Sequence, residues 1–320
     1  MGKSKKNKSQ HFVPRVYLGA WTDPETPAQM DPYVWIFERK SREGRRKAPV
    51  NIFEETDFYT TEGADGERDL RVEEALNRIE TRFVKARQKI EKHQRLSARE
   101  HVDLVAFVAA MEGRTKAQRD HQRRQWGEVK EKMDLMIDAD ARLTPDQRRA
   151  RRSAPSVPGE DSGGTYEDVE RFLTYPMRVV VPAMIEAMAP ILAMMHWMIF
   201  ETDDPIGFIT SDAPCVIVDP AAYRRGPMYR GAGLGYQTTE VSMALSPRQL
   251  VAFTHHDGCD GYFGSDRQIL DEFNRRAWMR SYEHYIVRKN ETLDAWFEKR
   301  EDPPDSWENT HGRRDDDDGA

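Results

Sequence analysis

The chain has 320 residues, of which 38% are hydrophobic and 32% are charged, which is the composition of a water-soluble protein. Its two cysteines, Cys215 and Cys259, are too few and too far apart for a disulfide framework or a recognisable metal motif. The most apolar stretch, Val179 to Phe200, contains two prolines, a glutamate and a histidine, which argues against a membrane span. No apolar signal-peptide core accompanies the N-terminal lysines, and we expect a cytoplasmic protein.

The net charge of −6 is distributed unevenly along the chain. Residues 301–320 contain eight acidic residues and two arginines, and they account for the whole net charge. Three segments are basic instead, namely 1–10, 39–47 and 142–152, and such runs are either solvated surface or contacts for an anionic partner. We predict a basic disordered arm over 1–10, a single domain over 11–300 and an acidic disordered tail over 301–320. Both terminal segments are candidates for binding protein partners.

The first half of the chain is predicted to begin with short strands and to continue as long helices. Tyr33 to Phe37 is a β-branched and aromatic run typical of a strand, and 58–61 is a weaker strand candidate. Apolar residues then recur at steps of three and four from Val72 to Ile90, which predicts a long amphipathic helix. Ser97 followed by Glu100 is the pattern of a capping box and predicts the start of the next helix.

This second long helix changes character along its length. Its apolar stripe runs from Leu104 to Met111 and resumes at Trp126. Between these points the same face carries polar side chains, including Thr115 and Gln118. Because buried polar groups need hydrogen-bond partners, the helix either projects beyond the core at this point or lines a polar site.

The second half of the chain changes from helical spacing to strand spacing. Residues 153–164 are rich in Pro, Gly and Ser and predict a mobile linker. Thr165 to Phe200 has helical spacing but contains three prolines, so we expect two or three helical segments. Strands are then predicted over 207–210, 215–218, 240–245, 249–254 and 285–287, with a helix from Ser265 before the last of them. The predicted fold class is α+β, with long antiparallel helices in the centre and short strands from the N-terminal and C-terminal regions forming a mixed or antiparallel sheet.

His11 is the first candidate site residue, because an imidazole exchanges a proton near neutral pH without special tuning. It begins the run His11-Phe-Val-Pro-Arg15, in which Pro14 restricts the backbone and Arg15 offers a guanidinium fork for an anion. The alternative is a histidine with a purely structural role. We predict His11 as a general acid or base and Arg15 as a substrate-binding residue.

Arg114 follows Gly113 at the point where the second helix turns polar. A guanidinium there can hold a phosphate or a carboxylate through two parallel hydrogen bonds, and the alternative is an ordinary surface arginine. Glu80 borders the apolar stripe of the first helix, so we expect it to be shielded and to act as a general base, as the partner of Arg114, or as part of a simple salt bridge. Thr115 and Gln118 lie on the polar face and are predicted to bind substrate.

The run Thr210-Ser-Asp-Ala-Pro214 ends a predicted inner strand and adds Ser211 and Asp212 to the candidates. A hydroxyl and a carboxylate at a strand exit suit a site, but the same residues are typical of an Asx-turn before a proline. Ser211 has no Gly-x-Ser-x-Gly elbow around it and is not expected to be a hydrolase nucleophile of that type. Asn274 on the last main helix is expected to donate to the same site or to cap a neighbouring element.

These short motifs follow one another in a specific order. They are His11, Pro14, Tyr17 and Leu18, the strand 34–37, Asp57 to Tyr59, Glu73 to Glu80, Gly113 to Thr115, Thr210 to Pro214, and Phe273 with Asn274. In this order they resemble the bacterial domain-of-unknown-function family numbered 4238 over about residues 11–290. The resemblance implies a shared polar set, without implying a particular reaction. That set consists of His11, Glu80, Arg114, Ser211, Asp212 and Asn274.

The leading hypothesis is a hydrolase or transferase that acts on a phosphate-bearing substrate, with a nuclease of a toxin or phage-defence type as the best guess. His11 would be the acid/base, Arg114 would stabilise developing negative charge, and Asp212 or Glu80 would orient His11 or hold a divalent ion such as magnesium or manganese. A nucleic acid or nucleotide is the expected partner, and no membrane is expected. The alternatives are a non-catalytic protein-interaction protein and a nucleic-acid-binding protein that does not cut. The catalytic hypothesis requires His11, Arg114 and Asp212 to share one cleft.

Overall fold

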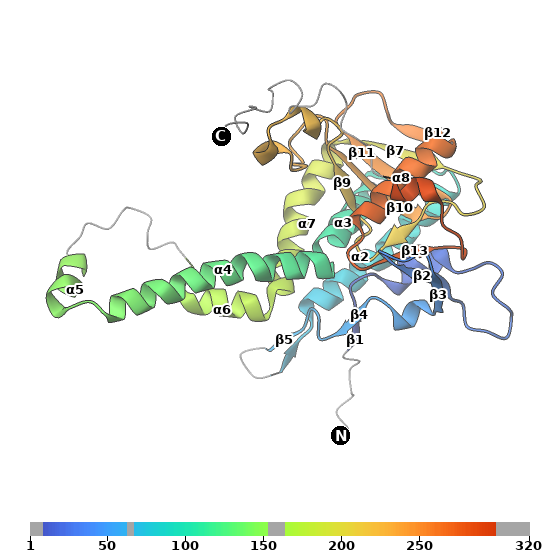
Figure 1. Ribbon diagram of the computed structural model, residues 1–320. Helices are drawn as coiled ribbons and strands as arrows, with labels where there is room; N and C mark the ends of the chain where they lie inside the picture. Colours follow the sequence, from blue (N-terminus) through green and yellow to red (C-terminus); the bar gives the residue numbers. More distant parts are fainter. Residues whose placement is uncertain (1–8, 63–66, 153–163, 299–320) are drawn as a thin grey trace, which may run out of the picture.

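Two main β-sheets and a group of long helices form the body of the molecule, and a helical arm extends from it (Figure 1). The computed structural model describes residues 9–62, 67–152 and 164–298. The helices are α1 (Arg15–Leu18), α2 (Arg71–Glu91), α3 (Ala98–Gly113), α4 (Lys116–Ala141), α5 (Pro145–Arg152), α6 (Tyr166–Thr174), α7 (Pro176–Met194) and α8 (Arg267–Arg280). The predicted α+β class is confirmed.

The strands are short, and most belong to the two main sheets. They are β1 (Ser9–His11), β2 (Val34–Glu38), β3 (Gly44–Lys47), β4 (Glu54–Thr56), β5 (Thr61–Glu62), β6 (Arg68–Asp69), β7 (His196–Glu201), β8 (Thr210–Ser211), β9 (Val216–Val218), β10 (Glu240–Ser246), β11 (Gln249–Thr254), β12 (Gly261–Gly264) and β13 (His284–Val287). The larger sheet has the order β12-β7-β11-β10-β9 and the smaller one β3-β2-β13-β8, while β1-β4 and β5-β6 form separate ribbons.

The larger sheet is built around the β10–β11 hairpin, which the sequence predicted. Every residue of β11 is buried, so both faces of this strand are covered, which explains its continuous apolar run. Only the β12–β7 pair is parallel among the described strands of this sheet. The sheet is therefore mixed, and its centre lies in the main apolar core.

The segment 196–200 is a strand, and the prediction that it ends a helix is wrong. Helix α7 ends at Met194, and Met195 adopts an extended conformation. The next six residues pair with β11 in a register that runs from His196 opposite Thr254 to Glu201 opposite Gln249. A short apolar run fits a buried helix and a buried strand equally well, and here the pairing partner decided between them.

The smaller sheet joins the two ends of the described chain, as predicted. Strand β2 near the N-terminus pairs with β13 near the C-terminus, so that Phe37 lies opposite Tyr285. These two rings are stacked, with their centroids 5.0 Å apart. The cross-strand pair therefore adds aromatic packing to the backbone hydrogen bonds of the sheet.

Helices α2, α3 and α7 pack together in the body. The predicted stripe on α2 is buried through Leu76, Phe83 and Ile90. Phe83 stacks on Phe107 of α3 with 3.6 Å between the ring centroids. Helix α3 starts with the predicted capping box, in which the Ser97 hydroxyl accepts from the backbone N–H of Glu100.

Helix α7 is, among the described residues, the one helix long and apolar enough to cross a membrane by length and composition, with 28% of its apolar window buried. It contains Pro182 and Pro190 without breaking, whereas two or three segments were predicted for 165–200. Helices α6 and α7 together supply two of those segments. Val181 and Leu192 of α7 lie in the main core, and the helix packs against α3.

The helix predicted to continue past Met111 is broken at Arg114. Helix α3 ends at Gly113, Thr115 caps a new helix, and α4 begins at Lys116. Of the two alternatives for its polar face, projection is the one observed. Figure 1 shows α4 leaving the body with α6 alongside it and α5 at the outer end.

Strand β1 begins at Ser9, the first described residue, two residues before the predicted domain boundary. Strand β1 pairs with β4, and Gln10 is buried. The weaker strand predicted over 58–61 is also wrong, because the chain turns at Asp57, where φ is +52°, and pairs again only from Thr61. The rest of the predicted N-terminal arm, nearly all of the predicted linker and the acidic tail lie outside the described residues.

Candidate active site

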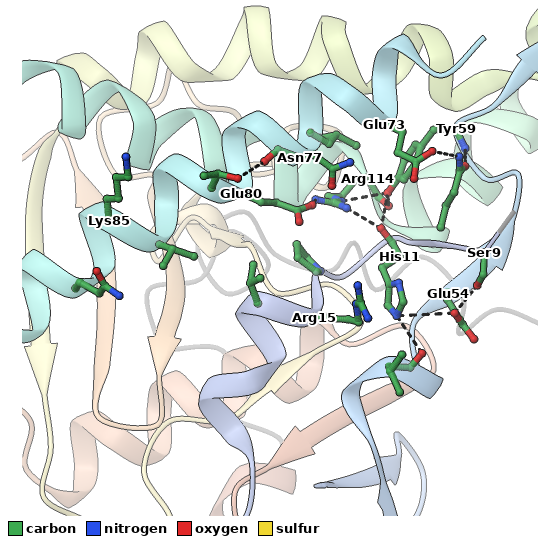
Figure 2. A pocket seen from close by; sticks show the side chains of 18 residues that line it. Ser9, His11, Arg15, Glu54, Tyr59, Glu73, Asn77, Glu80, Lys85 and Arg114 are labelled. Atoms are coloured by element: carbon green, nitrogen blue, oxygen red, sulfur yellow. Dashed lines mark hydrogen bonds and ion pairs between the residues drawn. The ribbon is translucent and has the colours of Figure 1, made fainter. Parts of the chain in front are cut away.

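A cavity of about 850 Å³ opens between the N-terminal segment and α2 (Figure 2). Four of the predicted site residues line it: His11, Arg15, Glu80 and Arg114. The other polar lining residues are Ser9, Gln10, Glu54, Tyr59, Glu73, Asn77, Thr81, Lys85 and Gln88. The cavity is therefore built from a strand edge, the short helix α1, one face of α2 and the end of α3.

Arg114 is buried beside this cavity, with 2% of its surface exposed. Its Nη1 donates to Glu80 Oε1 at 2.7 Å, its Nε to the Tyr59 hydroxyl at 3.1 Å, and its Nη2 to the carbonyl oxygen of His11 at 2.6 Å. The predicted pairing of Arg114 with Glu80 is confirmed. Because one of its three donated hydrogen bonds goes to the carbonyl oxygen of His11, Arg114 holds the backbone at His11 in place. Its predicted role in stabilising substrate charge stays a prediction.

The His11 side chain lies near Val50 and Glu54, and 16% of it is exposed. Its Nε2 is 3.3 Å from the carbonyl oxygen of Val50 and 3.9 Å from Glu54 Oε2. Burial lowers the pKa of His11 below its ordinary value of 6.5, and Glu54 acts in the opposite direction. The imidazole is therefore neutral near pH 7 and available to accept a proton.

Two exposed cationic side chains lie along the same cavity. Arg15 begins α1, just after the strand that ends at His11, and its positive charge acts to lower the pKa of His11. Lys85 lies further along α2, as Figure 2 shows. Within 9–62, 67–152 and 164–298, neither Arg15 nor Lys85 forms an ion pair, so both cations are available to an anionic ligand.

Gln10 anchors the strand that carries His11, although it was predicted to lie in a disordered arm. Its Nε2 donates to Thr60 Oγ1 at 2.7 Å and to Glu73 Oε2 at 2.6 Å, and its Oε1 accepts from the backbone N–H of Tyr59 at 2.7 Å. Sequence reasoning missed Gln10, Glu54 and Tyr59 as site residues. The only available signal was the motif that contains Tyr59, because a glutamine beside a lysine-rich run has no distinctive pattern.

Asp212 does not line this cavity, and the prediction that it shares a cleft with His11 and Arg114 is wrong. Its Oδ1 accepts from the backbone N–H of Tyr282 at 2.7 Å, and its Oδ2 from Glu283 at 2.7 Å and His284 at 2.9 Å. Burial raises the pKa of Asp212, and the three donated hydrogen bonds act against that rise. Asp212 therefore has a structural role, in which it accepts hydrogen bonds at the start of β13 and not the local hydrogen bond of an Asx-turn.

Ser211 and Asn274 are also committed to backbone groups outside the cavity. The Ser211 hydroxyl accepts from the N–H of Ala213 at 3.1 Å. Asn274 accepts from the N–H of Ile209 at 2.9 Å and donates to the carbonyl of Gly207 at 3.0 Å. Both side chains are buried. They pair with backbone N–H and C=O groups around β8 that have no partner in a neighbouring strand. Their predicted catalytic roles do not fit this geometry.

Thr115 and Gln118 form the N-terminal cap of α4 instead of a substrate contact. The Thr115 hydroxyl accepts from the backbone N–H of Gln118 at 3.1 Å, which satisfies one of the free donors at the start of the helix. Neither residue lines the cavity. Of the three predicted substrate-binding residues, Arg15 alone faces it.

One group of described residues brings metal-ligand atoms together, and it lies away from the cavity. Asp212, Glu283 and His284 have ligand atoms within 4.8 Å of one another. Both carboxylate oxygens of Asp212 already accept backbone hydrogen bonds, and Glu283 pairs with Lys116 at 3.1 Å. This group is occupied by structural contacts, and a divalent ion at the site stays a prediction.

The fold and the cavity together define an α+β protein with a polar site at the junction of its first strand and first long helix. The family model described as "Protein of unknown function (DUF4238)" matches residues 9–292, which is most of the chain. The chain therefore belongs to this family, and the resemblance found from the motif order is confirmed. Searches among curated proteins and among solved structures gave no match.

Proposed function

We propose that the protein is a hydrolase or transferase acting on a phosphate-bearing substrate held in the cavity of His11 and Arg15. A nucleic acid or nucleotide is the proposed substrate, and nuclease chemistry is the leading reaction. The toxin or phage-defence setting stays a prediction from the sequence.

The observation that carries the proposal is the pairing of a proton acceptor with an available cation in one cavity. Figure 2 shows the Arg15 guanidinium beside the His11 imidazole. A guanidinium with no internal carboxylate partner is suited to a phosphate, because its planar fork matches two phosphate oxygens. In this proposal Arg15 supplies the cation that binds the anion. The cleft of His11, Arg114 and Asp212 that the sequence hypothesis required is not formed, because Asp212 lies outside the cavity, and the proposal therefore depends on His11 and Arg15.

The hydrogen bonds of His11 define which ring nitrogen can act. A neutral imidazole that donates from Nε2 to the Val50 carbonyl carries its lone pair on Nδ1. Nδ1 is then the general base that takes a proton from water or from a substrate hydroxyl as that oxygen attacks phosphorus. Glu54, 3.9 Å from Nε2, stabilises the imidazolium that forms. The same imidazolium returns the proton to the leaving oxygen.

The size and polarity of the cavity support a substrate larger than free phosphate. Its volume of about 850 Å³ is in the range of pockets that hold cofactor-sized ligands. Lys85 lies along α2, away from His11 and Arg15, and Gln88 of the same helix also lines the cavity. Lys85 offers a second phosphate contact, as a dinucleotide or a longer strand would require.

The test is a turnover and binding assay on the purified full chain. The substrates are labelled single-stranded RNA, single-stranded DNA, duplex DNA and bis-p-nitrophenyl phosphate, each with and without magnesium or manganese. His11→Ala should lower turnover by about 100-fold or more, as loss of a general base does. Arg15→Ala should weaken substrate affinity by roughly tenfold, since a charge-assisted hydrogen bond is lost.

Matched controls separate the site from general effects of charge. His121 and Lys132 are exposed on α4, so His121→Ala and Lys132→Ala should leave turnover unchanged, whereas Lys85→Ala should weaken binding. Turnover that survives in His11→Ala overturns the catalytic assignment. Binding without turnover in the native chain would instead favour the alternative of a nucleic-acid-binding protein that does not cut.

A further inference from the structure

A second cavity, of about 760 Å³, opens just beyond the C-terminal end of α2 and shares no lining residue with the cavity of His11. Its walls come from the link between α2 and α3, the end of α7 with the start of β7, and the start of β12. The aromatic and charged side chains that line it include His93, Arg95, His101, Trp197, Asp260 and Tyr262. None of these residues belongs to the polar set predicted from the sequence.

Aromatic rings from several elements line the second cavity. The His93 ring lies parallel to the Tyr262 ring, with 4.4 Å between the centroids and 10° between the planes. The His101 ring packs against Trp197 with 5.4 Å between the centroids. Because 57% of the His93 side chain is exposed, a planar ligand can extend the stack that His93 forms with Tyr262.

The backbone at His93 has a conformation that is unusual for its residue type. Its φ is +54°, and it lies directly after α2, where glycine or asparagine is the usual residue. The turn is closed by backbone hydrogen bonds from His93 to Ile90 at 2.9 Å and from Gln94 to Lys89 at 2.8 Å. Glycine would make this turn without the steric cost of a side chain, and strained positions of this kind cluster at ligand sites. The feature that glycine would lack is the ring that lines the cavity.

The unpaired charge at the second cavity is positive. Arg95 is exposed and forms no ion pair in the part of the chain that the structure describes. Asp260 supplies the carboxylate among the described lining residues, and both of its oxygens are engaged. Its Oδ2 is 2.8 Å from His196 Nδ1, and its Oδ1 accepts from the backbone N–H of Trp197 at 2.9 Å. An anionic group in this cavity therefore meets Arg95 without facing an unpaired carboxylate.

Two ring nitrogen groups are available to hydrogen-bond a ligand. Burial lowers the pKa of His101 below its ordinary value of 6.5, with Asp260 acting in the opposite direction, so the imidazole is neutral near pH 7. Neither the His101 ring nor the Trp197 indole N–H hydrogen-bonds to another described residue. A neutral imidazole offers one donor and one acceptor, and an indole offers one donor. Together they match the edge of a heterocyclic ring.

We infer that the second cavity binds a nucleotide of the size of a nucleoside monophosphate, independently of the cavity of His11. The base stacks on His93 and hydrogen-bonds to His101 and Trp197, and the phosphate pairs with Arg95. The cavity volume is in the range of pockets that hold such ligands. Free phosphate would leave the rings without a partner, and an uncharged aromatic compound would leave Arg95 without one. The inference does not depend on the proposed turnover at His11.

Isothermal titration of the purified full chain with AMP, GMP, CMP and UMP tests the inference. At least one nucleotide should bind roughly tenfold more tightly than its nucleoside or inorganic phosphate. Arg95→Gln should raise the dissociation constant by roughly tenfold, since a charge-assisted hydrogen bond is lost. His93→Asn should do the same by removing the ring, while asparagine keeps the left-handed backbone. Thermal unfolding checks that both variants stay folded.

Two controls assign the nucleotide to this cavity. Lys92 is an exposed neighbour that does not line the cavity, and Lys92→Gln should leave binding unchanged. Arg15→Ala alters the cavity of His11 and should also leave this binding unchanged. The nucleotide should change the tryptophan fluorescence of the native chain, and this change should be lost in Trp197→Phe.

Three results would overturn the inference. They are the absence of nucleotide binding, binding that is unaffected by both Arg95→Gln and His93→Asn, and binding that is lost in Arg15→Ala but retained in Arg95→Gln. The last result would assign the nucleotide to the cavity of His11. Turnover is tested separately with His11→Ala, so the second cavity and the proposed function can fail independently.

Discussion

The cavity and the turn at Thr210–Pro214 both use a buried ionised side chain to hold the backbone, and they differ in what lies next to it. Arg114 donates to the carbonyl of His11 beside a cavity of about 850 Å³ that opens to solvent. Asp212 accepts from three successive N–H groups at the start of β13, and it lines no part of that cavity. The first side chain positions groups that a ligand can reach. The second completes hydrogen bonds that the fold itself needs.

This comparison shows why a list of polar motif residues is not a list of catalytic residues. Burying an ionised group is costly unless its hydrogen bonds are satisfied, so a fold retains such groups for structure as well as for chemistry. A catalytic polar group differs from a structural one because it lies beside a solvent-accessible cavity with other available polar groups. His11 and Arg15 face one, whereas Ser211 and Asn274 face backbone.

Replacing Asp212 should give the largest loss of stability. Asp212→Ala leaves the backbone N–H groups of Tyr282, Glu283 and His284 without their carboxylate acceptor, and the free energy of unfolding should fall by about 3 kcal/mol. Urea unfolding of the purified chain measures this. Asp203 is exposed nearby, and Asp203→Ala should change stability by less than about 0.5 kcal/mol. A drop of less than about 1 kcal/mol for Asp212→Ala would contradict its structural role.

Breaking the ion pair of the cavity should cost nearly as much. Arg114→Met leaves Glu80 shielded without its partner, and stability should fall by about 3 kcal/mol. Adding Glu80→Gln removes the stranded charge, so the double variant should recover more than about 1 kcal/mol relative to additivity. Urea unfolding of the native chain, the two single variants and the double variant measures this double-mutant cycle. Strict additivity would show that the two side chains act independently.

Removing the cap of α4 should have a moderate effect confined to stability. Thr115→Ala should cost about 1 kcal/mol, and Thr115→Ser should cost much less because it keeps the hydroxyl. Neither change should alter substrate binding in the cavity, as measured by fluorescence anisotropy with labelled RNA. Loss of binding in Thr115→Ala with binding retained in Thr115→Ser would restore the substrate contact that the sequence suggested.

The smallest effect is the pH dependence that His11 contributes. Burial holds its pKa below 6.5 in the folded chain, so below about pH 6.5 the unfolded chain binds more protons. Stability should therefore fall as the pH drops from 6.5 towards the folded pKa. His11→Gln should remove a few tenths of a kcal/mol of that fall between about pH 7 and pH 5. An unchanged pH profile in this variant would show that the pKa of His11 is not lowered.

Several elements and contacts could be predicted because they depend on neighbours in the sequence. The capping box at Ser97 follows from a local pattern and was found as predicted, and the strand predicted at 33–37 is found at 34–38. The pairing of Glu80 with Arg114 was one of the alternatives that the sequence offered for Glu80, and the structure shows this pair. The strand at 196–201 could not be predicted, because a short apolar run fits a buried helix and a buried strand equally well. Pairing with β11 makes this segment a strand.

The sequence by itself determined the α+β class, the long amphipathic helices, the family and the presence of His11 and Arg15 in one short segment. These depend on periodicity, caps and motif order, which act over a few residues. Only the tertiary structure decided that Gln10 anchors β1, that Arg114 holds the backbone at His11 and that Asp212 lies away from the cavity. The roles of these three side chains depend on which distant backbone groups need a hydrogen-bond partner in the folded chain. The local sequence does not show which groups these are.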